Sequence, residues 1–551
     1  MTPSTVRAGQ ARSEMQPKDV DAKTRLRQED MIRRVLLNGT EQWTTVYDDW
    51  NSGNGITGGW YCAFSQPGQR DAVLSKDGWN LTKGGGLPGF YEICDQHEIV
   101  GEYSRCIADP GIEPLVLVQE FHGVVPDSLL ISEEFCLLMN LWRDPRENNY
   151  YEIGDDGSKE LGIRFKDGKI AIRTSLLRRY QAARQLDLLL FANSIVWVDS
   201  DLPKEAFVDD QLELVDRDKL FTISRAVGKY SIYPGRASSR LLTKKLLPPR
   251  PQETCGIFPW SRVAKYMSFI IGEDDEGQPV EFTCNPDELA NYFGKNPDAP
   301  HYLTPVFFKP EVMQRYYDEP TVYSVSDGQL SCAMKWGVQI DNGSPEFVAV
   351  FLGDIGRDIP PSHWKHWASY NILPPGRMSD SAVHRSFYGK FIETENPEFL
   401  FKYAYRELQD AWERNWGWKL YRDPAGNDRE IIHRFRIPLT TRNADLNDQL
   451  LNLAKLMVDL LNERDIGKHM TAAESDRGIT KLKRFLEEQE YKFADRDIVL
   501  LRRIQALRSM VVAHTSGNKG TALLEKELAG RGKREFFTAL LQEATTTMKD
   551  L

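Results

Sequence analysis

Leu501-Arg-Arg-Ile-Gln-Ala-Leu-Arg508-Ser-Met-Val-Val-Ala-His514-Thr-Ser-Gly517 is the stretch of this chain that says most about its fold. Apolar residues recur here at the spacing of one helix face, which predicts an amphipathic helix over residues 495–513. The stripe consists of Leu500, Ile504, Leu507, Met510 and Val511. Arg508 lies beside this stripe and His514 continues it, so both side chains are expected to border the packed face. Gly517 predicts the end of the helix.

Around this stretch, residues 441–551 predict an all-α domain. Four helices are expected, over residues 444–464, 475–490, 495–513 and 534–548. Four helices within about 110 residues suit an up-down four-helix bundle. The preceding residues 396–440 predict a helical connector with one helix over 399–416 and an extended segment over 431–438.

The upstream regions predict a multidomain α+β protein. Residues 41–246 have a β-rich pattern that includes an Asp167-Gly168 hairpin turn and a helix with a basic face over 176–190. A proline-rich connector, 247–251, precedes a mixed α+β domain over 252–395. Within that domain, helices are expected over 286–293 and 310–317. Residues 1–40 predict a flexible N-terminus with a short helix over 24–37.

The composition limits the possible classes of protein. At 551 residues and a net charge of −10, the chain is too long for one core and too acidic for a general nucleic-acid coat. Residues 441–551 carry 19 basic and 17 acidic residues, whereas the rest carry 51 and 63. The C-terminal region is therefore the least acidic part. The seven widely spaced cysteines form no Cys-x-x-Cys, and the start is polar, so we expect a cytoplasmic protein without disulfides or a membrane span.

The spacing of Arg508 and His514 resembles the Arg-x(4–6)-His signature of the HEPN superfamily, whose members are small helical domains. Spacing alone is weak evidence, because three other pairs satisfy it. These are Arg357 and His363, Arg377 and His384, and Arg464 and His469. Only the pair of Arg508 and His514 lies on a strong amphipathic helix within a predicted bundle. The resemblance covers residues 441–551.

The resemblance implies a metal-independent endoribonuclease that requires no cofactor. Arg508 and His514 would be catalytic, because arginine binds phosphate through two hydrogen bonds and a histidine near neutrality acts as a general acid or base. Ser509, Asn518 and Lys519 would contact the RNA. A homodimer would bring two such pairs into one cleft.

The architecture also resembles single-chain bacterial abortive-infection and antiphage defence proteins. In such a protein the N-terminal regions would sense a trigger or restrain a toxin-like nuclease, through a protein trigger or inhibitor. The alternative is a non-catalytic interaction protein in which Arg508 and His514 only flank a bundle helix. Its N-terminal domains would then bind a protein or peptide.

Other motifs give weaker hypotheses. Residues 84–89 are glycine-rich but lack the lysine of a phosphate-binding loop, and His97 and His122 lie among acidic residues. His363 and His366 have a spacing that can bind a metal, without a nearby carboxylate pattern. The basic helix face of Arg178, Arg179 and Arg184 predicts a solvated surface or a guide for RNA or a partner.

Overall fold

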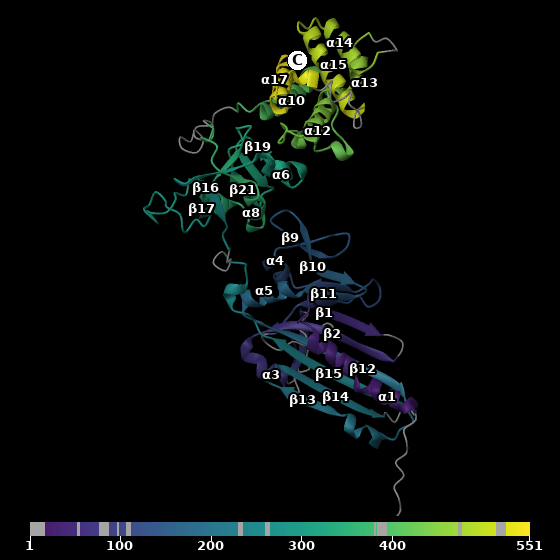
Figure 1. Cartoon of the computed structure of the whole chain (residues 1–551). Helices are drawn as coiled ribbons and strands as arrows, with labels where there is room; N and C mark the ends of the chain where they lie inside the picture. Colours follow the sequence, from purple (N-terminus) through teal and green to yellow (C-terminus); the bar gives the residue numbers. More distant parts are fainter. Residues whose placement is uncertain are drawn as a thin grey trace, which may run out of the picture. The chain divides into compact units, whose positions relative to one another are not determined.

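The computed structural model describes residues 17–51, 55–75, 88–95, 98–105, 112–229, 235–258, 265–379, 382, 394–471, 476–513 and 525–551. The chain forms two compact units (Figure 1). Unit 1 contains Met1–Gly154 and Ser158–Val263, and unit 2 contains Asp155–Gly157 and Ala264–Leu551. The expected β-rich N-terminal region and helical C-terminal region are confirmed.

Unit 1 is built on an eleven-stranded antiparallel sheet with the order β13-β14-β15-β12-β2-β1-β11-β10-β9-β8, and β5 also pairs with β2 (Figure 1). Its strands are β1 (Trp43–Asn51), β2 (Ile56–Ser65), β5 (Ile112–Pro114), β8 (Leu141–Arg143), β9 (Tyr150–Ile153), β10 (Lys159–Lys166), β11 (Lys169–Arg173), β12 (Asp187–Asp199), β13 (Leu212–Asp216), β14 (Phe221–Lys229) and β15 (Arg236–Leu247). Two hairpins stand outside this sheet: β3 (Pro88–Asp95) with β4 (Glu98–Arg105), and β6 (Val116–Gln119) with β7 (Ser128–Ile131).

Helices cover both faces of the sheet at the central strand β12. Leu188 and Leu190 share a core with α5 (Thr174–Arg184), whereas Leu189 faces α3 (Arg70–Leu74) on the opposite side. The remaining helical elements of unit 1 are α1 (Pro17–Arg27), α2 (Glu29–Leu37), η1 (Pro67–Gln69), α4 (Glu133–Leu138), η2 (Lys204–Asp210) and η3 (Gln252–Thr254). Strand β12 is buried on both faces over its first half, which explains its continuous apolar sequence.

Two local expectations in unit 1 have different outcomes. The hairpin at Asp167-Gly168 is confirmed, since both residues have positive φ and join β10 to β11. The expected helix over 176–190 is wrong at its end. Helix α5 stops at Arg184, and Gln185 adopts a left-handed conformation that starts the turn into β12. The apolar run that follows is drawn into the sheet because there it pairs with two neighbouring strands.

The α+β part of unit 2 consists of small sheets around an aromatic core. Its elements are β16 (Ser268–Glu273), β17 (Pro279–Thr283), β18 (Pro305–Phe308), η5 (Pro310–Met313), α6 (Gln314–Asp318), β19 (Tyr323–Ser326), β20 (Gln329–Cys332), β21 (Trp336–Gln339), β22 (Val348–Phe351), α7 (Leu352–Asp358), α8 (Pro361–Ala368) and β23 (Asn371–Ile372). The helical expectation over 310–317 is confirmed, but the helix over 286–293 is absent. There, the Asn291 side chain accepts hydrogen bonds from two backbone N–H groups, and this stabilises a turn instead.

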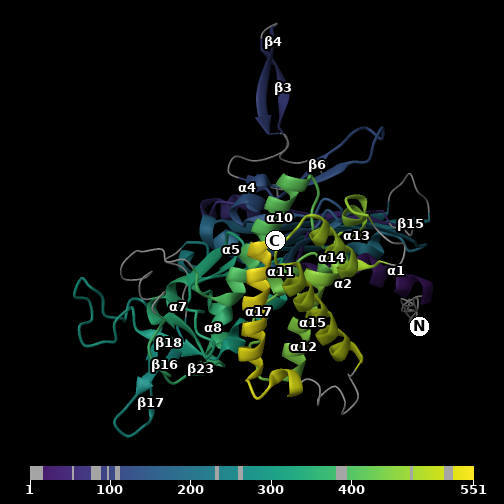
Figure 2. The ribbon, with the colours of Figure 1, turned by 90° about the horizontal axis from the view of Figure 1, so that it is seen from above.

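The helical part of unit 2 shares one hydrophobic core. Its elements are α10 (Pro397–Trp416), η6 (Gly426–Asp428), α11 (Ile431–Arg434), α12 (Asn443–Ala454), η7 (Lys455–Asp459), α13 (Glu463–Lys468), α14 (Gly478–Glu488), α15 (Ala494–Ala513) and α17 (Lys533–Asp550). Figure 2 shows α12, α14, α15 and α17 gathered together. Helix α10 contributes Phe401, Leu408 and Trp412 to the same core, so this helix does more than connect two domains.

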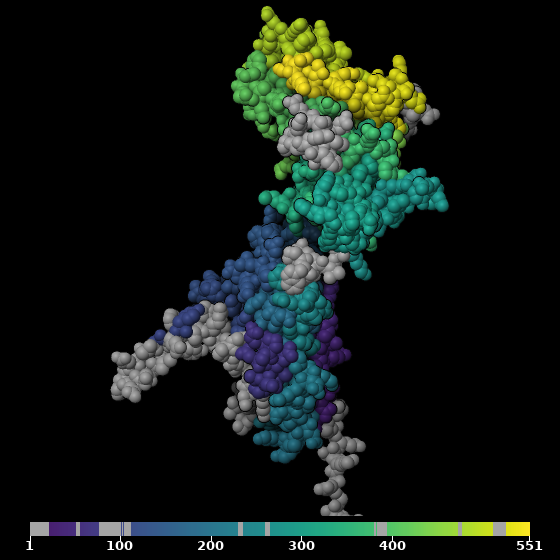
Figure 3. Space-filling model, turned by 90° about the vertical axis from the view of Figure 1, so that its left-hand side faces the viewer, coloured from purple at the N-terminus to yellow at the C-terminus, as the bar shows by residue number. Residues whose placement is uncertain are grey.

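Two further expectations in this part are wrong. The single helix over 444–464 is interrupted by the π-helical turn η7 and a break before α13. The extended segment over 431–438 begins with the short helix α11. In the space-filling view, the helical part, green to yellow, adjoins the teal α+β part of unit 2 (Figure 3).

Candidate functional site

Helix α15 carries the candidate site at its C-terminal end. Leu501, Ile504 and Leu507 are almost completely buried in the helical core, which confirms the amphipathic pattern of this helix. Its first turn contains Asp495 and Asp497, whose negative charges interact favourably with the positive end of the helix dipole. The described helix ends at Ala513, so Arg508 lies in its last two turns.

Arg508 forms an ion pair across the helical part. Its Nη1 lies 2.6 Å from Oδ1 of Asp459, and the two side chains remain 39% and 31% exposed. This exposure leaves the guanidinium partly accessible from solvent. A guanidinium has five N–H donors, and Asp459 is the partner it has among the described residues. The ion pair therefore orients Arg508 through Nη1, and its remaining N–H groups donate to no other residue that the structure describes.

The π-helical turn η7 positions Asp459. This turn follows the end of α12, and the Leu460 N–H donates to the Lys455 carbonyl, five residues earlier. Arg422 contacts the same turn, since its Nη2 donates a hydrogen bond to the Asp459 carbonyl at 2.7 Å. Its backbone N–H also donates to the Leu460 carbonyl. Two arginines, Arg422 and Arg508, thus meet at one turn.

Of the other expected site residues, the structure describes Ser509. Ser509 is exposed, and its hydroxyl donates to the Gln505 carbonyl at 3.0 Å, which leaves the oxygen free to accept. His514, Asn518 and Lys519 lie outside the described residues. The geometry between Arg508 and His514 therefore rests on their spacing in the sequence.

Sequence reasoning missed Asp459 and Arg422. Asp459 is a polar residue between apolar ones in the predicted helix over 444–464, and no sequence signal marked the π-helical turn that contains it. Arg422 belongs to the segment between α10 and α11, where no periodicity singled it out. Only the packing of residues distant in sequence brings Asp459 to Arg508 and Arg422 to the turn that carries Asp459.

Two of the weaker hypotheses lose support. In unit 1, Arg178 donates to the Pro248 carbonyl, Arg179 pairs with Glu152, and Arg184 pairs with Glu113 and Glu134. These guanidinium groups are occupied within unit 1, so the basic face is neither simply solvated nor an open cationic surface for RNA.

His363 and His366 belong to the aromatic core of the α+β part. His363 is fully buried, and its Nδ1 lies 3.1 Å from the Tyr316 hydroxyl, while His366 Nε2 lies 2.8 Å from the Val312 carbonyl. Burial lowers the pKa of both, that of His363 to about 4. Among the described residues, no group of three or more His, Cys, Asp or Glu side chains is arranged to hold a metal ion. His97 and residues 84–87 lie outside the described residues.

The arginines of the competing Arg–His pairs, Arg357, Arg377 and Arg464, lie outside α15. Arg357 forms ion pairs with Asp354 and Asp358 on α7. The histidine at the matching sequence spacing, His363, is buried. His384 lies outside the described residues. His469 follows the short helix α13, where its ring stacks on Trp418.

Among the described helices, none has both the length and the apolar character needed to cross a lipid bilayer. Comparison of the chain with models of protein families, with curated proteins and with solved structures found no match.

Proposed function

We propose that the helical part of unit 2 is a metal-independent endoribonuclease of the HEPN type, with Arg508 and His514 as its catalytic residues. Ser509, Asn518 and Lys519 would contact the RNA, and a second copy of the chain would complete the site. The biological role proposed is antiviral defence of the abortive-infection or toxin type. The N-terminal regions would sense a trigger or restrain the nuclease.

The observation that carries the proposal is the state of Arg508. Arg508 is half-exposed, and Asp459 holds it by one terminal nitrogen. Such an arginine is oriented in advance and keeps donors for the two-point binding of a phosphate.

The proposed reaction is a transfer of phosphate within the RNA. One His514 imidazole accepts the proton of a ribose 2′-hydroxyl, and the 2′-oxygen forms a bond to the adjacent phosphorus. The bond from phosphorus to the 5′-oxygen breaks, and that oxygen takes a proton from a second imidazole, His514 of the partner subunit. The products are a 2′,3′-cyclic phosphate and a 5′-hydroxyl. Arg508 would stabilise the charge that develops on the phosphate oxygens.

The test is cleavage of total bacterial RNA in EDTA by the full chain, with and without a phage lysate as a trigger. Wild type, Arg508→Ala and His514→Ala are compared with Arg502→Ala, which removes an exposed arginine from the same helix. We expect wild type to produce 2′,3′-cyclic phosphate ends. The cleavage rate should fall at least about a hundredfold in Arg508→Ala and His514→Ala and should be retained in Arg502→Ala.

A second function is favoured by the same ion pair, because Asp459 neutralises Arg508 and joins η7 to α15. In that case the helical part is a non-catalytic interaction module and the pair is structural. Absence of cleavage under both conditions, with all variants folded and dimeric, would decide for this alternative. Cleavage that persists in Arg508→Ala and His514→Ala would exclude the proposed catalytic pair.

A further inference from the structure

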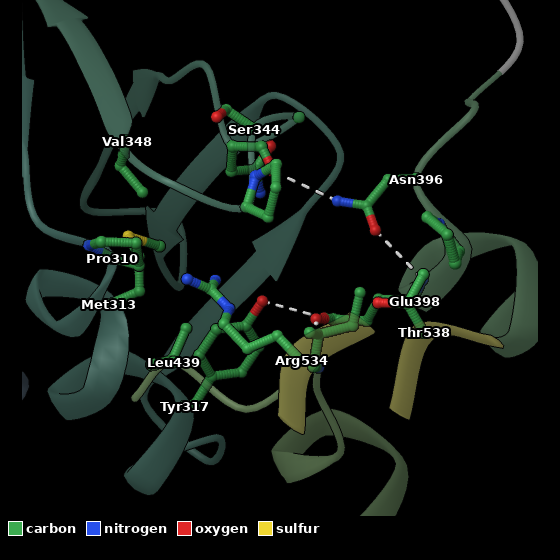
Figure 4. A pocket seen from close by; sticks show the side chains of 15 residues that line it. Pro310, Met313, Tyr317, Ser344, Val348, Asn396, Glu398, Leu439, Arg534 and Thr538 are labelled. Carbon is green, nitrogen blue, oxygen red and sulfur yellow. Dashed lines mark hydrogen bonds between the residues drawn. The ribbon is translucent and has the colours of Figure 1, made fainter. Parts of the chain in front are cut away.

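A cavity of about 150 Å³ lies within unit 2, between its α+β part and its helical part (Figure 4). Residues from five separate stretches of the chain line it, among them Met313 of η5, Val348 of β22, Glu398 of α10 and Arg534 of α17. A cavity of this size accommodates a molecule about as large as benzene. It is separate from the Arg508 site, because none of its lining residues belongs to that site.

Arg534 is the charged group that distinguishes this cavity. Figure 4 shows its side chain extended across the cavity with the guanidinium directed toward Met313. The Nε atom is buried and has no hydrogen-bond partner among the described residues. Burial lowers the pKa of Arg534, and the charges of Glu311, Asp445 and Glu346 offset this shift only in part. The group thus stays cationic in a partly desolvated place.

The other charged lining residue is already compensated. Glu398 accepts hydrogen bonds from the Tyr317 hydroxyl at 2.8 Å, from Lys402 Nζ at 2.7 Å and from the Ile437 backbone N–H at 3.1 Å. Its negative charge is therefore neutralised by Lys402. Among the described residues, no carboxylate forms an ion pair with Arg534, so its guanidinium has no direct anionic partner and Glu311, Asp445 and Glu346 act on it only from beyond ion-pair distance.

The remaining surface decides the kind of molecule that fits. Asn396 uses its amide within the wall, since Oδ1 accepts from Glu398 N–H and Nδ2 donates to the Asn342 carbonyl. Most of the other lining side chains are apolar: Pro310, Met313, Pro345, Val348, Pro397, Ile437 and Leu439. A charged end facing Arg534 and an apolar body against these side chains would satisfy both parts of the cavity.

We propose that this cavity binds a small organic anion, with its carboxylate or phosphate on Arg534 and its apolar body against Met313, Val348 and Leu439. An unpaired, partly desolvated guanidinium lowers the stability of the fold, and an anionic ligand would remove that penalty. The ligand would contact both parts of unit 2, because the lining residues come from both.

The test measures binding of benzoate to the full chain by calorimetry and by thermal unfolding, with benzamide as the uncharged probe of the same shape. Phenyl phosphate and isobutyrate complete the set and distinguish phosphate from carboxylate and aromatic from aliphatic ligands. We expect at least one of the three anions to bind saturably and to raise the unfolding temperature, and benzamide to bind at least about tenfold more weakly than benzoate.

Three variants locate the binding. Arg534→Met keeps the apolar stem and removes the charge, and it should weaken anion binding at least about tenfold while leaving the ligand-free protein equally or more stable. Arg534→Lys should bind with intermediate affinity. Arg531→Met, three residues earlier and outside the cavity, should bind as wild type does. Absence of binding by all three anions, or undiminished binding in a folded Arg534→Met, would overturn the proposal.

Discussion

Arg508 and Asp459 lie 49 positions apart in the sequence, and their side chains meet at 2.6 Å. Because both are partly solvated, the pair itself contributes little to stability, in the range of ~0–1 kcal/mol for exposed ion pairs. Its value for the proposed nuclease is geometric. A long, flexible arginine side chain is held in one orientation by a carboxylate on a turn that the core supports.

The ion pair allows a test of whether Asp459 positions the Arg508 guanidinium. Given the proposed nuclease, Asp459→Asn should lower kcat/KM for RNA cleavage by about tenfold, which corresponds to ~1.4 kcal/mol of transition-state stabilisation. The loss should be smaller than in Arg508→Ala, because the guanidinium is still present. Steady-state cleavage of a labelled RNA and thermal unfolding check both parts. A fall in unfolding temperature that accounts for the loss of activity would contradict a positioning role.

The burial of His363 predicts a pH dependence of stability. Desolvation, assisted by Arg315, lowers the pKa of His363 to about 4 in the folded protein, whereas an unfolded histidine has a pKa of about 6.5. Between these values the unfolded chain binds more protons, so the free energy of unfolding falls as the pH falls from 6.5 toward 4. The contribution reaches ~1.4 kcal/mol per pH unit.

The variant His363→Asn removes this titration and keeps a polar atom near the Tyr316 hydroxyl, which His363 Nδ1 contacts. Urea unfolding at pH 7, 6 and 5 should show a shallower pH dependence in the variant than in wild type. Equal slopes in the two proteins would mean that His363 is not the group responsible.

At the scale of elements, α15 contributes a buried face from Ala494 to Leu507, and the helix contacts α12, α14 and α17. The helix was predictable from sequence because its apolar residues repeat at helical spacing, and such a stripe must be buried somewhere. The same reasoning failed for residues 444–464. There the apolar stripe continues while η7 changes the hydrogen-bond pattern, and periodicity in a sequence does not distinguish an α-helical turn from a π-helical one.

Two substitutions on α15 test which face is packed. Leu507→Ala removes a fully buried side chain from the core and should destabilise unit 2 by ~2–5 kcal/mol. Val499→Ala changes a side chain that is 67% exposed on the same helix and should stay within ~0.5 kcal/mol of wild type. Denaturant unfolding of both variants gives the comparison. Similar losses in the two would show that the helix is packed differently.

At the scale of the whole molecule, each compact unit has hydrophobic cores of its own. The cores of unit 1 are organised around β12, and the two main cores of unit 2 belong to its α+β part and its helical part. Domains with separate cores unfold separately unless a large apolar interface couples them.

Differential scanning calorimetry of the full chain should therefore resolve more than one transition. Leu190→Ala, in the core of unit 1, should lower the transition of that unit, and Leu507→Ala should lower one of unit 2. For units of this size, each kcal/mol corresponds to about 2–4 °C. A single transition that both variants shift equally would contradict independent unfolding.

The sequence by itself determined some of the local elements and the coarse order of the chain: a β-rich N-terminal region, a mixed middle and a helical C-terminal region. The hairpin at Asp167-Gly168 and helix α15 were predictable because a turn that requires positive φ and a repeating apolar stripe act over a few residues. The pattern also singled out Arg508 as a candidate.

Only the tertiary structure decided which distant residues meet. The order of eleven strands, the pairing of Arg508 with Asp459 and the cavity around Arg534 all join residues far apart in the chain. The physical reason is that such contacts follow from burying the faces of many elements at once, and no single segment carries that information. This is also why α5 ends at Arg184, since the apolar residues that follow are stabilised by pairing with strands on either side.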